Sequence, residues 1–185
     1  MKKYEFTGET KTVSFLSGDV TLHRIQAITS FASVVAGELG GWIEKEENLS
    51  HKGDAWVSEN AWVSGNAVVS GNAWVSENAW VSENAVVRGN AVVRGNAMVR
   101  KNAVVSENAE VFSVRHVLVI GPIGSRNAFT TFYHDKDNEI TVQCGCFIGK
   151  IDKFLEKVAQ THGDSKYAQV YRKAVELAKL QILTD

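Results

Sequence analysis

The 185-residue chain has almost no net charge and no long apolar run. Its formal net charge is −1, so the overall electrostatic field gives no reason to expect a nucleic-acid polymer as partner. No segment reaches the ~18 apolar residues that a membrane-spanning helix needs, and the first residues lack the apolar stretch of a signal peptide. These absences predict a cytoplasmic protein that has no membrane partner.

Cysteine is scarce as well, with only Cys144 and Cys146 in the chain. Two thiols separated by one residue of a strand are too close to bridge easily, which predicts reduced cysteines in a reducing compartment. Apolar and polar residues alternate over 140–146, so both thiols are expected on the buried side of that strand as small core residues. No histidine stands at ligand spacing nearby, and we therefore predict neither a metal site nor a cofactor.

The chain is rich in one repeat, Ala-x-Val, which occurs ten times from Ala55 to Val111 with a period of six residues. Asparagine precedes nine of the ten alanines, and Asp54 precedes the first. A six-residue period fits neither an α-helix nor a hairpin, but it fits a coil of short straight sides. Within each copy the alanine and valine point the same way, into the coil, while asparagine and glycine fall at corners.

This repeat resembles the hexapeptide-repeat family of left-handed β-helices, over roughly residues 39–111. In that family three hexapeptides form one triangular coil of 18 residues, and successive coils stack at about 4.8 Å. The resemblance implies a mainly β fold, a left-handed parallel β-helix in the shape of a triangular prism. We expect an N-terminal cap and lead-in over 1–53, the β-helix over 54–111, and a small C-terminal α+β module over 112–185.

The C-terminal module is predicted to have a β-β-β-α-α order. Strands are expected at 117–120, 129–134 and 140–146, because apolar runs or alternation are separated there by turn residues. Helices are expected at 151–162 and 166–183, separated by Gly163 as a helix stop and Asp164-Ser165 as a helix start.

An 18-residue coil sorts the outward residues into three faces. The first carries Trp56, Trp74, Val92 and Glu110, the second Trp62, Trp80 and Met98, and the third Val68, Val86 and Val104. Contiguous apolar faces of this kind usually meet a partner surface. Because hexapeptide-repeat proteins typically form trimers, the resemblance implies a homotrimer, with Trp56, Trp62, Trp74, Trp80 and Met98 as interface candidates. The alternative is that some tryptophans stack on a planar ligand.

Two groups of residues are candidates for binding an anion. The first is the loop at 121–127 with the following strand, represented by Gly121, Gly124, Ser125, Arg126, Asn127 and Thr130. Its irregular backbone can aim N–H groups at an anion, although a tight turn between two strands explains the same residues. The second is a basic ring of Arg88, Arg94 and Arg100 in consecutive repeats, with solvated pairing to nearby glutamates as the alternative.

Many proteins of the hexapeptide-repeat family are acyltransferases, which typically use a histidine base and a loop extruded from the coil. Here the ten repeats run without an insertion, and no histidine lies between His51 and His116. We therefore expect no enzymatic activity. A divergent acyltransferase, in which His116 or His162 serves as the base, stays open as an alternative.

A narrower resemblance concerns phage and prophage hexapeptide-repeat proteins described as polymer-forming or cytoskeleton-like. It is carried by residues 39–44 (Leu-Gly-Gly-Trp-Ile-Glu), 120–127 and 144–147. Phages encode small oligomeric proteins that sequester the nucleotide signals of bacterial immunity. The resulting hypothesis is a non-catalytic, phage-type binding protein that holds an anionic small molecule, such as a nucleotide, at subunit interfaces. A structural or assembly module is the alternative.

Overall fold

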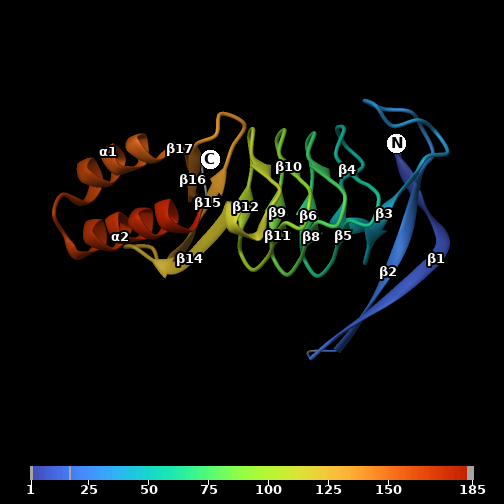
Figure 1. The fold of residues 1–185 in the computed structure, drawn as a ribbon, viewed down its shortest axis with the longest axis horizontal. Coiled ribbons are helices and arrows are strands. Elements are labelled where there is room, and N and C mark those ends of the chain that lie inside the picture. The colour runs from blue at the N-terminus through green and yellow to red at the C-terminus, as the bar shows by residue number, and fades with distance from the viewer. Residues whose placement is uncertain (1, 17, 183–185) are drawn as a thin grey trace.

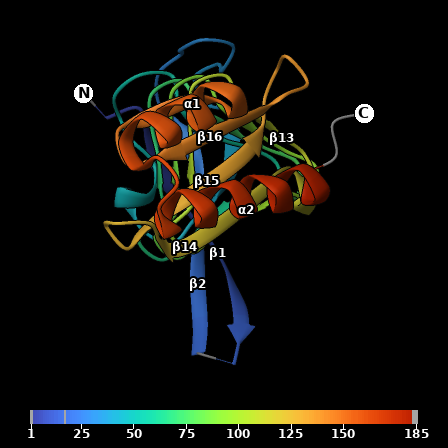
Figure 2. The same ribbon diagram turned by 90° about the vertical axis from the view of Figure 1, so that its left-hand side faces the viewer.

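The computed structural model describes residues 2–16 and 18–182, which form a hairpin, a solenoid and an α+β module in a row (Figure 1). Strands β1 (Tyr4–Phe15) and β2 (Gly18–Ala27) pair in an antiparallel hairpin. This hairpin projects from one end of the solenoid as an arm (Figure 2). No helix within the described ranges is long and apolar enough to cross a membrane.

The repeats form the predicted left-handed parallel β-helix, one two-residue strand for each Ala-x-Val copy. These strands are β4 (Trp56–Val57), β5 (Trp62–Val63), β6 (Val68–Val69), β7 (Trp74–Val75), β8 (Trp80–Val81), β9 (Val86–Val87), β10 (Val92–Val93), β11 (Met98–Val99), β12 (Val104–Val105) and β13 (Glu110–Val111). They stack as β5-β8-β11, β4-β7-β10-β13 and β6-β9-β12, with each strand paired to the one 18 residues later. The three predicted faces are confirmed.

The parallel stack begins before the first repeat. Strand β3 (Leu39–Ile43) lies beside β5, with Trp42 opposite Trp62, and it also pairs with β2 of the arm. The short helix η1 (Glu46–Asn48) follows, and Leu49 bridges to Val69. The arm is therefore joined to the solenoid through continuous backbone hydrogen bonding.

The solenoid interior consists of the repeated alanines and valines, all of which are fully buried. Their alternation with outward residues follows from the strand geometry, in which every second side chain faces the same side. At the corners, asparagine amides hydrogen-bond from one coil to the next, as from Asn60 to Asn78 and from Asn66 to Asn84. The predicted amide ladders thus stabilise the coil stacking.

The C-terminal module has four antiparallel strands rather than the three predicted. They are β14 (Val117–Ile123), β15 (Ala128–His134), β16 (Ile140–Cys144) and β17 (Phe147–Lys150), in that order, after the short helix η2 (Val114–His116). The fourth strand was missed because Gly145, with a φ of +59°, and Cys146 make a two-residue turn after Cys144. The chain then returns along β16.

Helices α1 (Ile151–His162) and α2 (Lys166–Gln181) cover the far side of this sheet (Figures 1 and 2). The sheet therefore lies between the helices and the solenoid. On β15, Phe132 packs with the helices, while Thr131 and Tyr133 face the solenoid. The predicted end of the second helix at Leu183 lies outside the described residues.

Candidate functional site

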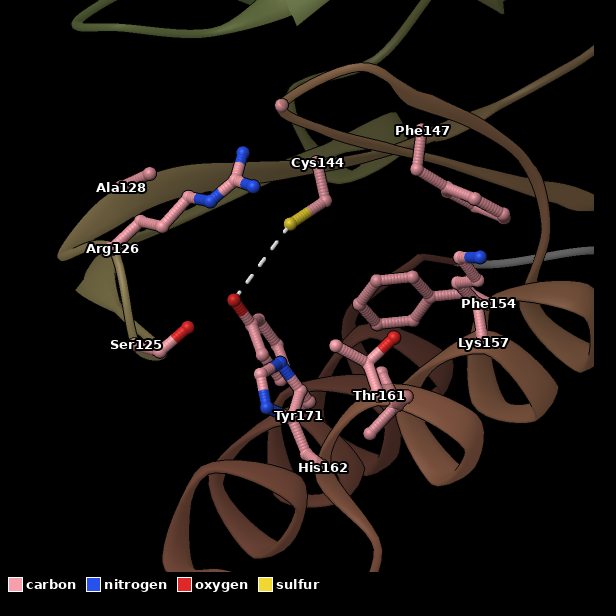
Figure 3. A pocket seen from close by; sticks show the side chains of 12 residues that line it. Ser125, Arg126, Ala128, Cys144, Phe147, Phe154, Lys157, Thr161, His162 and Tyr171 are labelled. Atoms are coloured by element: carbon pink, nitrogen blue, oxygen red, sulfur yellow. Dashed lines mark hydrogen bonds between the residues drawn. The ribbon is translucent and has the colours of Figure 1, made fainter.

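A pocket of about 220 Å³ opens in the C-terminal module between the sheet and helix α1 (Figure 3). The loop after β14 contributes Ser125 and Arg126 to one side, and the β16–β17 turn contributes Cys144 and Gly145. Aromatic rings from β17, α1 and α2 form much of the wall. They belong to Phe147, Phe154 and Tyr171.

The helices place their residues in the pocket through ordinary helical spacing. Phe154 and Val158 face the sheet and are buried, while Lys157 and Thr161, four residues apart, lie along the neighbouring edge of the same helix. His162 is the last residue of α1, and Gly163 directly after it ends the helix. The imidazole of His162 stacks on the ring of Tyr171, with 5.8 Å between ring centroids.

Three groups form a chain of polar contacts that runs from the buried Thr130 to two residues lining the pocket, Cys144 and Tyr171. The Thr130 hydroxyl donates to the sulfur of Cys144 at 3.3 Å, and that thiol lies 3.9 Å from the hydroxyl oxygen of Tyr171. Burial, together with the neighbouring Cys144, raises the pKa of Tyr171 to about 12, and Arg126 acts in the opposite direction. The phenol is therefore protonated at neutral pH and able to donate a hydrogen bond.

The pocket lining is basic. Arg126 and Lys157 contribute positively charged side chains to the lining, and His162 contributes an imidazole. None of the described residues that line the pocket is acidic. Figure 3 shows the Arg126 guanidinium on the side of Cys144 and the Lys157 ammonium beside Phe147 and Phe154. Cations set beside apolar walls suit a ligand that has an anionic group and a less polar body.

The predicted anion loop is only partly gathered at this pocket. Ser125 and Arg126 line it. Thr130 does not reach the pocket surface but hydrogen-bonds to Cys144, which does. Gly124, with a φ of +72°, packs so closely on Tyr171 that an added Cβ would overlap the phenol hydroxyl. Gly121 instead packs on Phe129, and Asn127 is exposed in the turn.

The three arginines of the predicted basic ring lie one on each stack of the solenoid. Arg88, Arg94 and Arg100 follow β9, β10 and β11, which belong to three different stacks. Arg94 lies 3.7 Å from Glu77 and packs over the ring of Phe112. Arg100 lines a separate hollow. These three cations therefore do not share one site within this chain, nor do they join the loop at 121–127.

The outward tryptophans are covered to different degrees by the chain's own N-terminal segment. Trp56 is fully buried, with Tyr4 and Phe31 packed edge-on against it. Trp62 and Trp80 stack on each other with 4.6 Å between ring centroids, and Phe15 of the arm stacks on both. Trp74 and Met98 are half-buried, and Met98 lines the same hollow as Arg100. Trp56 thus has no exposed surface for a neighbouring subunit.

Several residues of the pocket were not predicted, among them Lys157, Thr161 and Tyr171. The sequence does show Lys157 and Thr161 at helical spacing beside the apolar face of α1. Whether such residues line a pocket depends on what the helix packs against, which the sequence pattern does not reveal. The prediction that both cysteines are buried was wrong. Cys146 is exposed in the turn, and Cys144 is half-buried in the pocket. Among the described residues, no group of three or more His, Cys, Asp or Glu side chains is placed to hold a metal ion.

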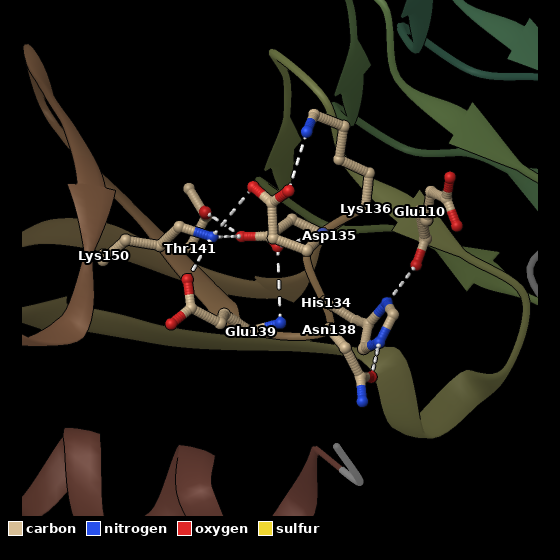
Figure 4. A network of polar contacts seen from close by, with 9 residues as sticks. Glu110, His134, Asp135, Lys136, Asn138, Glu139, Thr141 and Lys150 are labelled. Carbon is tan, nitrogen blue, oxygen red and sulfur yellow. Dashed lines mark hydrogen bonds and ion pairs between the residues drawn. The ribbon is translucent and has the colours of Figure 1, made fainter. Parts of the chain in front are cut away.

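A second polar cluster lies where the module meets the solenoid, centred on Asp135 (Figure 4). Asp135 is only 3% exposed and accepts hydrogen bonds from Lys150 and Thr141 as well as from backbone N–H groups. Burial alone would raise the pKa of Asp135, but the bonds from Lys150 and Thr141 outweigh it and hold the pKa below its usual range. The cluster fixes the β15–β16 turn against the last coil, where Asp135 bridges Ala109.

Replacing Asp135 with asparagine is expected to lower the free energy of unfolding by about 1–3 kcal/mol at pH 7. Because the pKa of this carboxyl is lower in the folded chain, its stabilisation is present above the unfolded pKa and disappears as pH falls through the folded value. The difference in free energy of unfolding between Asp135→Asn and the unaltered chain should therefore shrink below about pH 4. Urea titrations at several pH values measure it. Asp137→Asn, at an exposed partner of Lys150, serves as control and should change stability much less.

Comparison with known proteins finds a partial match to a bacterial protein. No protein-family model matches the chain. Over 61 residues the chain is 36% identical to a protein of Escherichia coli strain K12 named as an uncharacterized acetyltransferase, YdcK. The match covers 31% of this chain and 19% of that protein, so the chain spans well under two thirds of the relative's length. It fits the hexapeptide-repeat interpretation, and it contradicts the prediction that the chain is not an enzyme, because the similar protein carries an enzyme's name.

Proposed function

We propose that this chain is an acyl-transfer enzyme built on a hexapeptide-repeat solenoid, and that the pocket of its C-terminal module binds the anionic part of the substrate. The observation that carries this proposal is the meeting of Arg126, Lys157 and His162 around one pocket with apolar walls. The partial similarity to a protein named as an acetyltransferase supports the reaction class.

The chemistry of the pocket suits acyl transfer. Acyl donors of the thioester kind carry phosphates, which guanidinium and ammonium groups bind through charge-assisted hydrogen bonds. An imidazole such as His162 is the common general base for activating an acceptor amine or hydroxyl. The Tyr171 hydroxyl donates toward the negative charge that develops on a carbonyl oxygen during acyl transfer.

The location of the pocket explains how such an activity is compatible with uninterrupted repeats. The solenoid coils of this chain carry neither a histidine nor an extruded loop between Ala55 and Val111. In this proposal the C-terminal module supplies the binding groups and the general base. The solenoid acts as a rigid support for the sheet that holds them.

The proposal is tested by following thiol release from acetyl coenzyme A with the purified full chain and a panel of small amines and alcohols. Arg126→Ala and His162→Ala are expected to lower kcat/KM about tenfold to a hundredfold, because each removes a charged or basic group worth about 1.5–3 kcal/mol. Lys173→Ala is the control, since Lys173 is a surface cation on α2 that pairs with Glu176 and does not line the pocket. Its activity should equal that of the unaltered chain.

Two results of this experiment would overturn the proposal. If the folded chain releases no thiol above the rate without protein for any acceptor, it is not an acyltransferase. Equal loss in Arg126→Ala and Lys173→Ala would show that overall charge matters and that this pocket does not.

A second candidate function is capture of an anionic nucleotide signal by a phage- or prophage-encoded homotrimer. The combination of cations and aromatic rings in the pocket favours it, since a nucleotide presents phosphates and a flat ring. The half-buried outward residues Trp74 and Val92, on one face of the solenoid, offer an apolar surface for threefold assembly. Equilibrium dialysis with a nucleotide panel and light scattering test it, and a monomer that retains no nucleotide would reject it.

A further inference from the structure

We propose that the tip of the N-terminal arm docks into a hollow on a second copy of this chain, and that two copies make this contact reciprocally. The tip is the end of the β1–β2 hairpin and carries Leu16. The hollow, of about 200 Å³, is the one that Met98 and Arg100 line. It shares no lining residue with the pocket of the C-terminal module, so this inference is independent of the proposed acyl transfer.

Leu16 is an apolar side chain that its own chain does not cover. It is fully exposed, although the preceding Phe15 stacks on Trp62 and Trp80. A scattered exposed leucine is ordinary on a protein surface. Leu16 differs because the Phe15 stack anchors the end of the arm, so that the leucine is presented to solvent from a fixed point.

The hollow offers the cover that Leu16 lacks, because its lining is apolar apart from two cations. Met98 comes from the solenoid, and the rest comes from the segment that leads into the C-terminal sheet, namely Val114, Val117, Leu118 and Val119. An apolar cavity of ~150 Å³ takes up a benzene-sized group, so about 200 Å³ is sufficient for a leucine side chain. Insertion would bury apolar surface on both sides, since Val114 is 47% exposed in the single chain.

The charges of the two surfaces are complementary. The cations of the hollow, Arg100 and Lys101, are exposed, and neither forms an ion pair with a described residue. The tip carries the opposite sign, because Asp19 is the only charged side chain over 12–22. It is exposed as well, and no other described residue pairs with it. The tip therefore presents what the hollow requires, an apolar group close to an anion.

The positions of tip and hollow explain why the contact is reciprocal. Phe15 stacks on Trp80, and Met98 lies directly beside Trp80 in the β8–β11 pair, one strand spacing away (~4.8 Å). Figures 1 and 2 show the end of the arm and β14 on the same side of the solenoid. A twofold axis between the two sites brings each tip to the other copy's hollow. The chain's own tip does not fill its hollow, because Leu16 is exposed.

Sedimentation equilibrium of the full chain over a wide range of concentration tests this contact. We expect a reversible doubling in mass as concentration increases. Leu16→Asp should raise the dissociation constant of this step at least about a hundredfold, because a symmetric pair loses two buried leucines. Leu180→Asp is the matched control and should leave the dissociation constant unchanged, since Leu180 is 82% exposed on α2 and belongs to neither surface. Circular dichroism checks the fold of each variant.

A charge exchange tests whether tip and hollow meet on different copies. One variant carries Asp19→Lys, and the other carries Arg100→Glu together with Lys101→Glu. Each alone should stay monomeric at concentrations where the unaltered chain pairs, because like charges then meet at both contacts. Mixed in equal amounts, the two variants should form a mixed pair, in which each contact joins opposite charges. Native mass spectrometry identifies the mixed pair by its mass.

An unaltered chain that stays monomeric throughout would overturn the proposal. Equal weakening by Leu16→Asp and Leu180→Asp would do the same, as would a mixture of charge variants that pairs no better than either variant alone. A trimer that Leu16→Asp leaves intact, with no doubling in mass, would place assembly on another face and reject this one. These experiments measure mass and not thiol release, so their failure leaves the proposed acyl transfer standing.

Discussion

Replacing Trp56 with alanine is expected to lower the free energy of unfolding by about 3–5 kcal/mol. The indole is fully buried, and it joins the first solenoid coil to the cap through Tyr4 and Phe31. Gly40 of β3 lies so close that an added Cβ would come 2.6 Å from the indole. Such close packing leaves little room for neighbours to fill the space that the ring vacates, so the cavity remains.

The measurement is chemical denaturation followed by far-ultraviolet circular dichroism, with Trp74→Ala as the matched control. Trp74 stands directly above Trp56 in the same stack but is only half-buried. In a dilute monomer, Trp74→Ala should lower the free energy of unfolding clearly less than Trp56→Ala does. If Trp74→Ala were the more damaging change and Trp56→Ala nearly neutral, the cap would not pack on Trp56 as the structure describes.

The sequence predicted the solenoid in detail because the hexapeptide pattern involves only residues close together in the chain and recurs from coil to coil. A six-residue period dictates which side chains point inward, and the 18-residue coil dictates which outward residues share a face. The parallel pairing of Trp62 with Trp80 and of Val68 with Val86 confirms both steps. Each prediction needed only strand geometry and the length of one coil, with no knowledge of distant segments.

What covers the outward tryptophans could not be predicted in the same way. An apolar face requires a partner, but the sequence does not say whether the partner is another subunit or the chain itself. Phe15 reaches Trp62 and Trp80 only because the arm folds back along the solenoid, over contacts between residues 47 and 65 positions apart in sequence. The homotrimer remains a prediction, and Trp62, Trp74, Trp80 and Met98 are all half-buried within the single chain.

The candidate site shows a similar limit. Arg126 was recognisable as an exposed cation in an irregular loop, and the structure places it at a pocket. Tyr171 and Lys157 look like ordinary helix residues until the helices are docked on the sheet. The expectation of no enzymatic activity is contradicted by the partial similarity to a protein named as an acetyltransferase. That expectation rested on the absence of a histidine and an extra loop from the repeats, and the pocket described above lies in a separate module.

Lys3 is expected to give the protein a stability that rises with pH in the alkaline range. Its side chain is only 4% exposed, and its ammonium donates to the carbonyl oxygens of Gly53 and Ala55. Burial lowers the pKa of Lys3 to about 8, and Asp54 opposes that shift only in part. In the unfolded chain a lysine keeps its proton up to about pH 10.4.

Between these two values the unfolded chain binds more protons than the folded chain, so the free energy of unfolding must increase with pH. Lys3 thus penalises folding below pH 8, and the penalty is relieved as pH rises from about 8 to 10.4, by on the order of 3 kcal/mol. The rise should appear in the unaltered chain and in Lys2→Met, since Lys2 is an exposed neighbour. It should be clearly smaller in Lys3→Met, which has no proton to lose at this position, with the remainder due to Lys11, whose pKa burial also lowers. Urea titrations at four or five pH values measure it, and parallel curves for Lys3→Met and the unaltered chain would show that Lys3 keeps its proton when buried.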